Sequence, residues 1–307
     1  MLIAGPTASG KSDCAVALAQ AIEARGKRVV VINADSAQVY ADLNVLSARP
    51  SRQDMGGIEH RLFGTWGGAQ ACSAADWATV ATAEIASVHD AGALPLLVGG
   101  TGLYIRTLLD GIAPVPPIDE AVRAAVRALP VSDAYAALQW EDPARAAVLA
   151  PADAARIARA LEVVRSTGTT LGTWQAQTSG GIAHRVDVHA AILLPERVAL
   201  YERCDVRFAR MVARGAIEEV SRLLARELDP KLPVMRAIGV PELGAYLRSE
   251  MSLDEAQARS AQATRNYAKR QFTWLRHQLP SEWPRIEVAR FTGDEPRETI
   301  LRRFGLT

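Results

Sequence analysis

The chain has 307 residues, of which 49% are hydrophobic and 22% charged, a composition typical of a globular protein with one or two domains. Its 35 lysines and arginines nearly balance its 34 aspartates and glutamates, so bulk charge argues neither for nor against nucleic acid. No apolar run is long enough to cross a bilayer, and residues 1–10 lack a secretory pattern, so we expect a cytosolic protein with no membrane contact.

Strand and helix patterns alternate along the first third of the chain. Apolar or β-branched runs typical of buried strands cover residues 1–4, 28–33 and 94–98, and helical spacing covers 13–25 and 76–91. This alternation predicts a parallel α/β sheet whose chemistry lies at the carboxyl ends of its strands.

The pattern changes at residue 112, where IAPVPPID places three prolines in eight residues and marks a boundary. Residues 119–167 are rich in alanine and arginine and favour helices without a strand. A strand pattern returns at 186–194, and helices are expected at roughly 196–228 and 252–279. We therefore predict a P-loop-type parallel sheet core formed by 1–111 and 186–307, interrupted by a helical insertion domain at 112–185. The stretch from Pro280 onward is weakly patterned.

Residues 5–12 form a phosphate-binding motif. The stretch GPTASGKS matches G-x-x-x-x-G-K-[ST] in full, between a predicted strand and a predicted helix. Such a loop turns backbone N–H groups and a helix N-terminus toward an anion. Lys11 supplies charge to the phosphates, and Ser12 can ligate Mg²⁺. The residues expected to bind a diphosphate are Gly5, Pro6, Thr7, Ala8, Ser9, Gly10, Lys11 and Ser12.

The loop recognises phosphate rather than a particular nucleotide. A nucleotide hydrolase also needs a Mg²⁺-supporting carboxylate at the end of a buried strand. The strand LLV ends in GGTG without an acid, and no N-K-x-D sequence is present for reading guanine. Asp35, just beyond the strand RVVVIN, remains open between three roles: holding Mg²⁺, acting as a general base, or capping a short helix that starts at residues 36–38. Thr101 in the GGTG turn should face the same cleft.

One helix carries a local basic surface. Residues 259–276 contain Arg259, Arg265, Lys269, Arg270 and Arg276 and no acid. Most solvated charged faces carry both signs, so this helix favours contact with RNA phosphates. The second basic set, Arg156, Arg159 and Arg165, is interleaved with Glu162 and is a weaker signal.

The ordered set of motifs resembles the tRNA dimethylallyltransferase family, also called tRNA isopentenyltransferases. The motifs are GPTASGKS, NADSAQVY, LVGGTGLYIRTLL, DAARIARALEVVRSTG, RAIG and TRNYAKRQFTWLR, in that order from residue 1 to about 279. The resemblance implies transfer of a dimethylallyl group from dimethylallyl diphosphate to the exocyclic amine of the adenosine 3′ of the anticodon in tRNA. The loop would then hold the diphosphate of a leaving group, with Mg²⁺ as cofactor.

The resemblance also implies roles for individual residues. Asp35 matches the general base, Thr101 a residue at the reaction centre, and Arg207 an arginine that holds the diphosphate beside Lys11. The residues that match tRNA contacts are Asp35, Ser36, Ala37, Gln38, Thr101, Arg123, Ala155, Arg156, Arg159, Arg236, Lys269, Arg270, Gln271 and Arg276.

The chain departs from the family pattern at two places. EHRLFG (59–64) stands where many members have two adjacent histidines, a leucine and an aspartate, so we assign that stretch no catalytic role. Arg49 stands where the family pattern has a lysine.

Two other interpretations remain: a phosphate-loop kinase of a small molecule, and a non-catalytic tRNA-binding module with a vestigial loop. The long insertion fits the first poorly, and the intact Lys11, Ser12 and Asp35 argue against the second. We expect a monomer that binds tRNA and dimethylallyl diphosphate.

Overall fold

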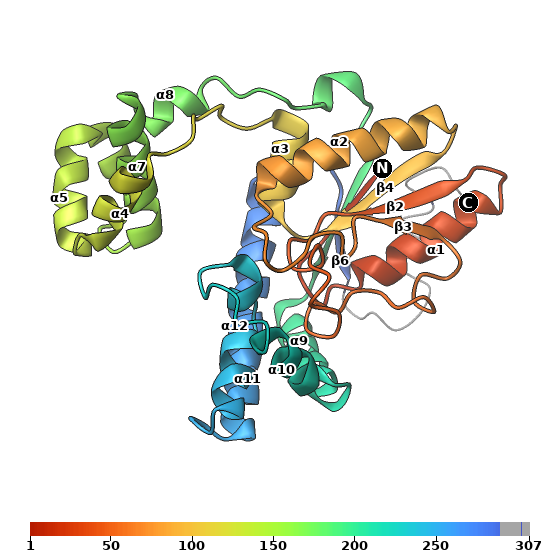
Figure 1. The fold of residues 1–307 in the computed structure, drawn as a ribbon. Coiled ribbons are helices and arrows are strands. Elements are labelled where there is room, and N and C mark those ends of the chain that lie inside the picture. Colours follow the sequence, from red (N-terminus) through yellow and green to blue (C-terminus); the bar gives the residue numbers. More distant parts are fainter. Residues whose placement is uncertain (289–301, 303–307) are drawn as a thin grey trace. The chain divides into compact units, whose positions relative to one another are not determined.

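A computed structural model describes residues 1–288 and residue 302. In the described residues, six parallel strands form one sheet in the order β3-β2-β4-β1-β5-β6 (Figure 1). The strands are β1 (Leu2–Ala4), β2 (Val29–Asn33), β3 (Glu59–Arg61), β4 (Leu94–Gly99), β5 (Ala190–Pro195) and β6 (Arg285–Val288). The predicted P-loop-type parallel core is confirmed.

The chain divides into two compact units. One comprises Met1–Leu108 and Arg185–Thr307, and the other comprises Leu109–His184. In chain order the first unit holds α1 (Lys11–Glu23), α2 (Ala74–Asp90), α9 (Arg197–Ala213), α10 (Ala216–Leu224), α11 (Val240–Leu247) and α12 (Leu253–His277), with the short turn η2 (Pro233–Arg236). Helix α3 (Gly102–Asp110) begins in the first unit and reaches the boundary.

Burial explains the composition of the central strands. Every residue of β1, β2 and β5 is buried, as expected for strands of a parallel sheet covered on both faces. The core of this unit includes Ile3, Leu18, Val31, Leu96 and Leu193. Helices cover the sheet because parallel strands need crossover connections.

Strand register brings three loops to one edge of the sheet. Ala4 pairs with Gly99, and Asn33 pairs with Val98. The residues that follow β1, β2 and β4 therefore leave the sheet at the same level. The connecting bonds are Gly5 N–H to Gly99 O at 3.1 Å and Ala34 N–H to Val98 O at 2.8 Å. The phosphate loop, Asp35 and the GGTG turn thus meet at the carboxyl edge, as the sequence predicts.

The second unit is helical and has its own core. Its helices are α4 (Glu120–Ala128), α5 (Val131–Glu141), α6 (Pro143–Ala146), α7 (Ala154–Thr167) and α8 (Leu171–Gln175). Val126, Leu138, Ile157 and Leu161 are almost fully buried together within it. Aspartate side chains cap the starts of α4, α6 and α7 by accepting backbone N–H groups.

Several elements differ from the sequence expectation. The single helix expected at 196–228 is two helices, because Gly215 (φ 100°) interrupts it between α9 and α10. Strands β3 and β6 and helix α3 were not predicted. Strand β3 is only three residues of EHR, and β6 lies in the weakly patterned stretch. Among the described residues, no helix is both long and apolar enough to cross a membrane.

Candidate active site

The phosphate loop holds a buried lysine. Gly10, in the left-handed region at φ 79°, ends the loop, and α1 starts at Lys11. The Lys11 ammonium lies 3.4 Å from the Pro6 carbonyl and 4.0 Å from Oδ2 of Asp35. Burial lowers the pKa of Lys11, and the negative charge of Asp35 offsets part of that effect. An anion in the loop would favour the charged form.

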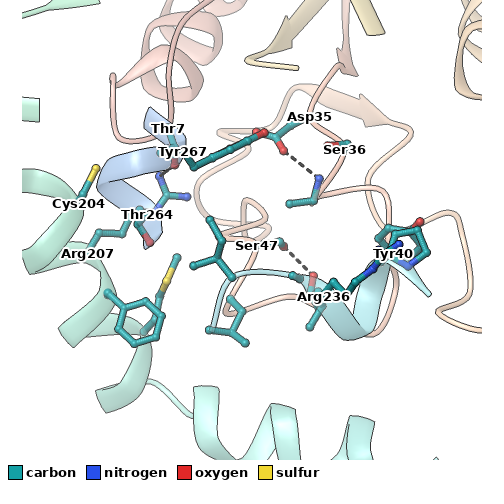
Figure 2. A pocket seen from close by; sticks show the side chains of 18 of the residues that line it. Thr7, Asp35, Ser36, Tyr40, Ser47, Cys204, Arg207, Arg236, Thr264 and Tyr267 are labelled. Atoms are coloured by element: carbon teal, nitrogen blue, oxygen red, sulfur yellow. Dashed lines mark hydrogen bonds between the residues drawn. The ribbon is translucent and has the colours of Figure 1, made fainter. Parts of the chain in front are cut away.

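Asp35 is fixed from both sides. Its backbone N–H donates to Oδ1 of Asn33 at 2.9 Å, and the Asn33 amide donates to its carbonyl at 3.0 Å. Its Oδ1 accepts from the Ala37 backbone N–H at 3.0 Å, a bond drawn in Figure 2. The carboxylate thus stabilises a local turn rather than the start of a helix. Its Oδ2 is the oxygen that faces Lys11.

Thr101 supports the same turn. Its hydroxyl oxygen accepts from the Ser36 backbone N–H at 2.9 Å, and the hydroxyl donates to the Ser36 side chain at 3.2 Å. The Thr101 backbone N–H also bonds the Ala34 carbonyl at 3.3 Å. The turn after β4 and the turn after β2 are therefore joined directly beside Asp35.

Arg207 brings a second cation to the loop. It lies on α9, and its guanidinium donates to the Thr7 hydroxyl at 3.3 Å. Burial lowers its pKa, and Asp35 again acts in the opposite direction. Lys11 and Arg207 thus bring two positive charges to the loop beside Asp35, an arrangement suited to a diphosphate.

A cavity of about 350 Å³ opens next to these groups (Figure 2). Thr7, Asp35 and Arg207 line its polar end. Its other walls are mainly apolar, and they include Leu43, Leu46, Phe208, Met211 and Ile238. Thr101 and Leu103 do not line this cavity, and Leu103 is 58% exposed on α3.

A buried carboxylate holds one wall of the cavity. Glu219 of α10 is 4% exposed, and its oxygens accept the backbone N–H groups of Asn44 (2.6 Å), Val45 (2.8 Å) and Leu46 (2.9 Å). Gln38 is also buried, and its amide donates to the carbonyls of residues 47 and 48. Gln38 therefore supports this loop through its amide nitrogen, and the tRNA contact expected of it stays a prediction.

The basic helix α12 has fewer unpaired charges than expected. Arg259 pairs with Glu255 one turn earlier, at 2.6 Å, and Arg265 pairs with Asp205 of α9. The expectation of a helix without compensating acids is therefore wrong for these two arginines. Lys269, Arg270 and Arg276 are exposed and pair with no acid in the described part of the chain.

Three further residues place positive or aromatic surface at the cavity. Arg270 lies over the ring of Tyr267, with 5.8 Å between the guanidinium carbon and the ring centroid, and both line the cavity. Arg236 of η2 lines it as well, from the opposite wall (Figure 2). The expected residues Ser36 and Ala37 are also part of the lining.

Gln271, expected among the tRNA contacts, is buried and 6% exposed. Its side-chain oxygen accepts the Thr7 backbone N–H at 2.8 Å, and its amide nitrogen donates to the Gly100 carbonyl at 2.9 Å. Both polar ends are used within the protein, so the side chain has no free group for RNA. The Thr7 N–H accordingly points at α12, not into the phosphate loop as the motif suggested.

The predicted residues of the helical insertion lie in the second unit. Ala155, Arg156 and Arg159 are exposed on α7, where Arg156 pairs with Asp153 at 3.4 Å and Arg159 with Glu162 at 4.0 Å. Arg123 of α4 is half-buried, and its Nε has no hydrogen-bond partner within residues 1–288 or at residue 302.

The donor set for a metal is small. In the described residues no group of three or more histidine, cysteine, aspartate or glutamate side chains could hold an ion. Ser12 follows Lys11 at the start of α1 and is half-buried. A Mg²⁺ ion keeps several waters and binds substrate phosphates, so one loop hydroxyl fits such an ion, while an ion held by protein ligands alone does not fit.

Comparisons with known proteins identify the family. The family model described as IPP transferase matches residues 38–278. This chain belongs to the IPP transferase family. It is 64% identical to a tRNA dimethylallyltransferase of Erythrobacter litoralis over 290 residues, covering 94% of this chain and 92% of that one. It is 59% identical to a tRNA dimethylallyltransferase of Sphingopyxis alaskensis, covering 98% and 99%. Family membership makes it a prenyltransferase.

Solved structures agree in fold. The tRNA isopentenylpyrophosphate transferase of Bacillus halodurans is 30% identical to the chain and aligns with a TM-score of 0.70, covering 99% of this chain and 94% of the other. A eukaryotic dimethylallyltransferase described as acting on tRNA is 24% identical, with a TM-score of 0.79 over 97% of this chain and 76% of the other. The second likeness shows the fold alone.

Sequence reasoning missed the cavity wall on α9. Cys204, Phe208 and Met211 line the cavity together with Arg207. They follow the spacing i, i+3, i+4 and i+7, which places them on one face of a helix. That periodicity was available in the sequence, but it does not distinguish a face that packs in the core from one that lines a cavity.

Proposed function

We propose that this prenyltransferase moves a dimethylallyl group from dimethylallyl diphosphate to the exocyclic amine of the adenosine 3′ of the anticodon in tRNA. One observation carries the proposal. The buried carboxylate of Asp35 lies 4.0 Å from the ammonium of Lys11, at the rim of a cavity whose other walls are mainly apolar. A base, a diphosphate site and an apolar space for a five-carbon group thus lie side by side.

The donor would lie with its diphosphate in the loop of residues 5–12 and its hydrocarbon toward Phe208 and Met211. As the allylic C–O bond breaks, negative charge grows on the departing diphosphate. Backbone N–H groups of the loop, Lys11 and Arg207 can stabilise that charge. Their positions are fixed before the reaction, so little reorganisation is needed.

The acceptor amine is a poor nucleophile because its lone pair is delocalised into the adenine ring. It must lose a proton as the new C–N bond forms, and Asp35 Oδ2 is the oxygen available to take it. General-base help of this kind is worth about 10²–10⁴-fold. The base must leave its stack to reach Asp35, which costs a few kcal/mol and least for an unpaired loop base. Tyr267 lines the cavity and offers a ring for stacking.

Mg²⁺ would be held by the Ser12 hydroxyl, with phosphate oxygens of the donor and water completing its coordination. When bound, the ion would neutralise part of the charge on the diphosphate. Lys11 and Arg207 would still anchor the diphosphate from the protein side.

The tRNA would be bound through exposed cations. Lys269, Arg270 and Arg276 on α12 and Arg236 on η2 are exposed in the first unit. Arg270 and Arg236 line the cavity itself, so they would contact the nucleotides nearest the reaction. Arg123, Ala155, Arg156 and Arg159 of the helical insertion would extend the contact to other parts of the tRNA.

The direct test incubates the purified protein with labelled dimethylallyl diphosphate, Mg²⁺ and bulk tRNA. We expect label in the nucleoside next to the anticodon after digestion. Calorimetry with ATP and with dimethylallyl diphosphate, each with tRNA present, tests the kinase alternative. Tighter binding of ATP together with phosphate transfer would overturn the proposal.

A further inference from the structure

One face of α12 packs directly on the two loops that hold the reacting groups. Gln271 bridges them, since its side-chain oxygen accepts from Thr7 in the phosphate loop and its nitrogen donates to Gly100 in the GGTG turn, at 2.8 and 2.9 Å. The exposed cations Lys269, Arg270 and Arg276 lie elsewhere on the same helix. Buried amides with both ends satisfied specify a single geometry.

The glycines of the turn permit this close approach. A Cβ added to Gly100 would lie 2.5 Å from Nε2 of Gln271, and one added to Gly102 would lie 2.2 Å from the ring of Trp274. A residue with a Cβ at either position would therefore displace one of these α12 side chains. The sequence GGTG therefore serves the contact with α12 as well as the tight turn itself.

Each end of Gln271 leads to a reacting group. Gln271 bonds the Thr7 backbone, and the Thr7 hydroxyl accepts a hydrogen bond from Arg207, which faces the proposed diphosphate site. Gln271 also bonds the carbonyl of Gly100. The next residue, Thr101, is hydrogen-bonded through its hydroxyl to Ser36, which adjoins Asp35. The distance between the diphosphate and the base is therefore set by two short chains that start at one side chain.

We propose that Gln271 is a positioning residue that fixes the phosphate loop relative to the base-bearing turn, and that it makes no contact with substrate. This inference rests on the proposed function for its kinetic consequence. Misplacing a reacting group by about 1 Å costs on the order of 10²-fold in rate. A loop freed from Gln271 should bind phosphate less tightly and hold the donor out of line with Asp35.

The test compares Gln271→Met, which keeps the side-chain length but removes both bonds, with Thr273→Ala, an exposed position on the same helix. Calorimetry measures inorganic pyrophosphate binding, steady-state kinetics give kcat and KM for the donor, and filter binding gives tRNA affinity. We expect roughly 10-fold weaker pyrophosphate binding and roughly 10²-fold lower kcat/KM, with tRNA affinity within about twofold of wild type. The control should match wild type in all three measurements.

Two results would overturn the inference: unchanged pyrophosphate binding, or a parallel loss of tRNA affinity, which would indicate a merely structural role. If the Met variant does not fold, Gln271→Asn replaces it, since its amide is one methylene too short to reach both partners. The pyrophosphate measurement does not depend on the organic donor. A wild-type protein that fails to transfer label, with pyrophosphate binding still weakened by the variant, would refute the proposed function and leave this inference standing.

Discussion

Lys11 should lower the stability of the empty protein while it serves substrate binding. The residue is 7% exposed, and burial lowers its pKa although Asp35 lies 4.0 Å away, so desolvation outweighs that attraction. Arg207 adds repulsion. Lys11→Met keeps the buried hydrocarbon and removes the charge. We therefore expect it to stabilise the unliganded protein at pH 7 by about 1 kcal/mol, or about 2 °C in Tm.

The pH dependence follows from the direction of the shift. The folded state binds the Lys11 proton less tightly than the unfolded state, whose pKa is near the ordinary 10.5. Between the lowered folded pKa and 10.5, the unfolded state carries more protons, so wild-type stability gains from rising pH. The penalty is complete below the folded pKa and disappears as pH rises through that window. The stability advantage of Lys11→Met should therefore shrink as the pH rises through that window toward 10.5.

Bound pyrophosphate should reverse the effect of Lys11→Met on stability. Inorganic pyrophosphate in the loop supplies the counter-charge that Lys11 lacks, and a hydrogen bond to a charged group is worth about 1.5–3 kcal/mol. The variant should therefore bind pyrophosphate roughly 10- to 100-fold more weakly. Thermal unfolding of both proteins at pH 7 and pH 10, with and without pyrophosphate, measures the stability difference, its dependence on pH and its reversal by ligand. A variant less stable than wild type at pH 7, or an advantage independent of pH, would refute the reasoning.

Three further predictions follow from the site. Asp35→Asn should reduce single-turnover transfer by roughly 10²-fold or more with tRNA affinity little changed; a rate near wild type would remove Asp35 as the base. Lys269→Ala with Arg270→Ala should weaken tRNA binding and lower the slope of log affinity against log salt by about 1 for each phosphate that is no longer bound, whereas Thr273→Ala should leave both unchanged; an unaltered slope would contradict RNA binding by this helix. Glu219→Ala leaves three backbone N–H groups without their acceptor and should lower the free energy of unfolding in urea by about 2–3 kcal/mol. A destabilisation below about 0.5 kcal/mol would contradict a stabilising role for these three hydrogen bonds.

Local patterns predicted the parts of the site that follow strands. The phosphate loop and Asp35 were found because each comes directly after a buried run, and parallel strands release such residues at one edge. Strand β3 was not predicted because its three residues, EHR, are too few to show a strand periodicity. Its place in the sheet comes from backbone pairing with β2, which local composition does not reveal.

Long-range pairing could not be predicted from one window of sequence. The stretch 259–276 contains no acid, yet Arg265 forms an ion pair with Asp205 on α9, and Arg259 forms one with Glu255 just before the stretch. Gln271 offers a similar lesson. The family resemblance implied contact between this residue and tRNA, while its side chain bonds residues 171 and 264 positions away in the chain.

The order of side chains on α9 gives the cavity a direction. Arg207 reaches the phosphate loop, and Met211 lies one helical turn farther along the same helix. Because Phe208 and Met211 are apolar, a ligand with a charged head and a hydrocarbon tail fits this face in one orientation only. In the proposed reaction, this orientation would place the carbon next to the diphosphate nearest to Asp35, the proposed base. A nucleoside diphosphate, whose organic part is polar and much larger, would bury its sugar hydroxyls against these apolar side chains at a desolvation cost. We therefore expect the loop to provide affinity for phosphate and the helix face beside it to discriminate between donors.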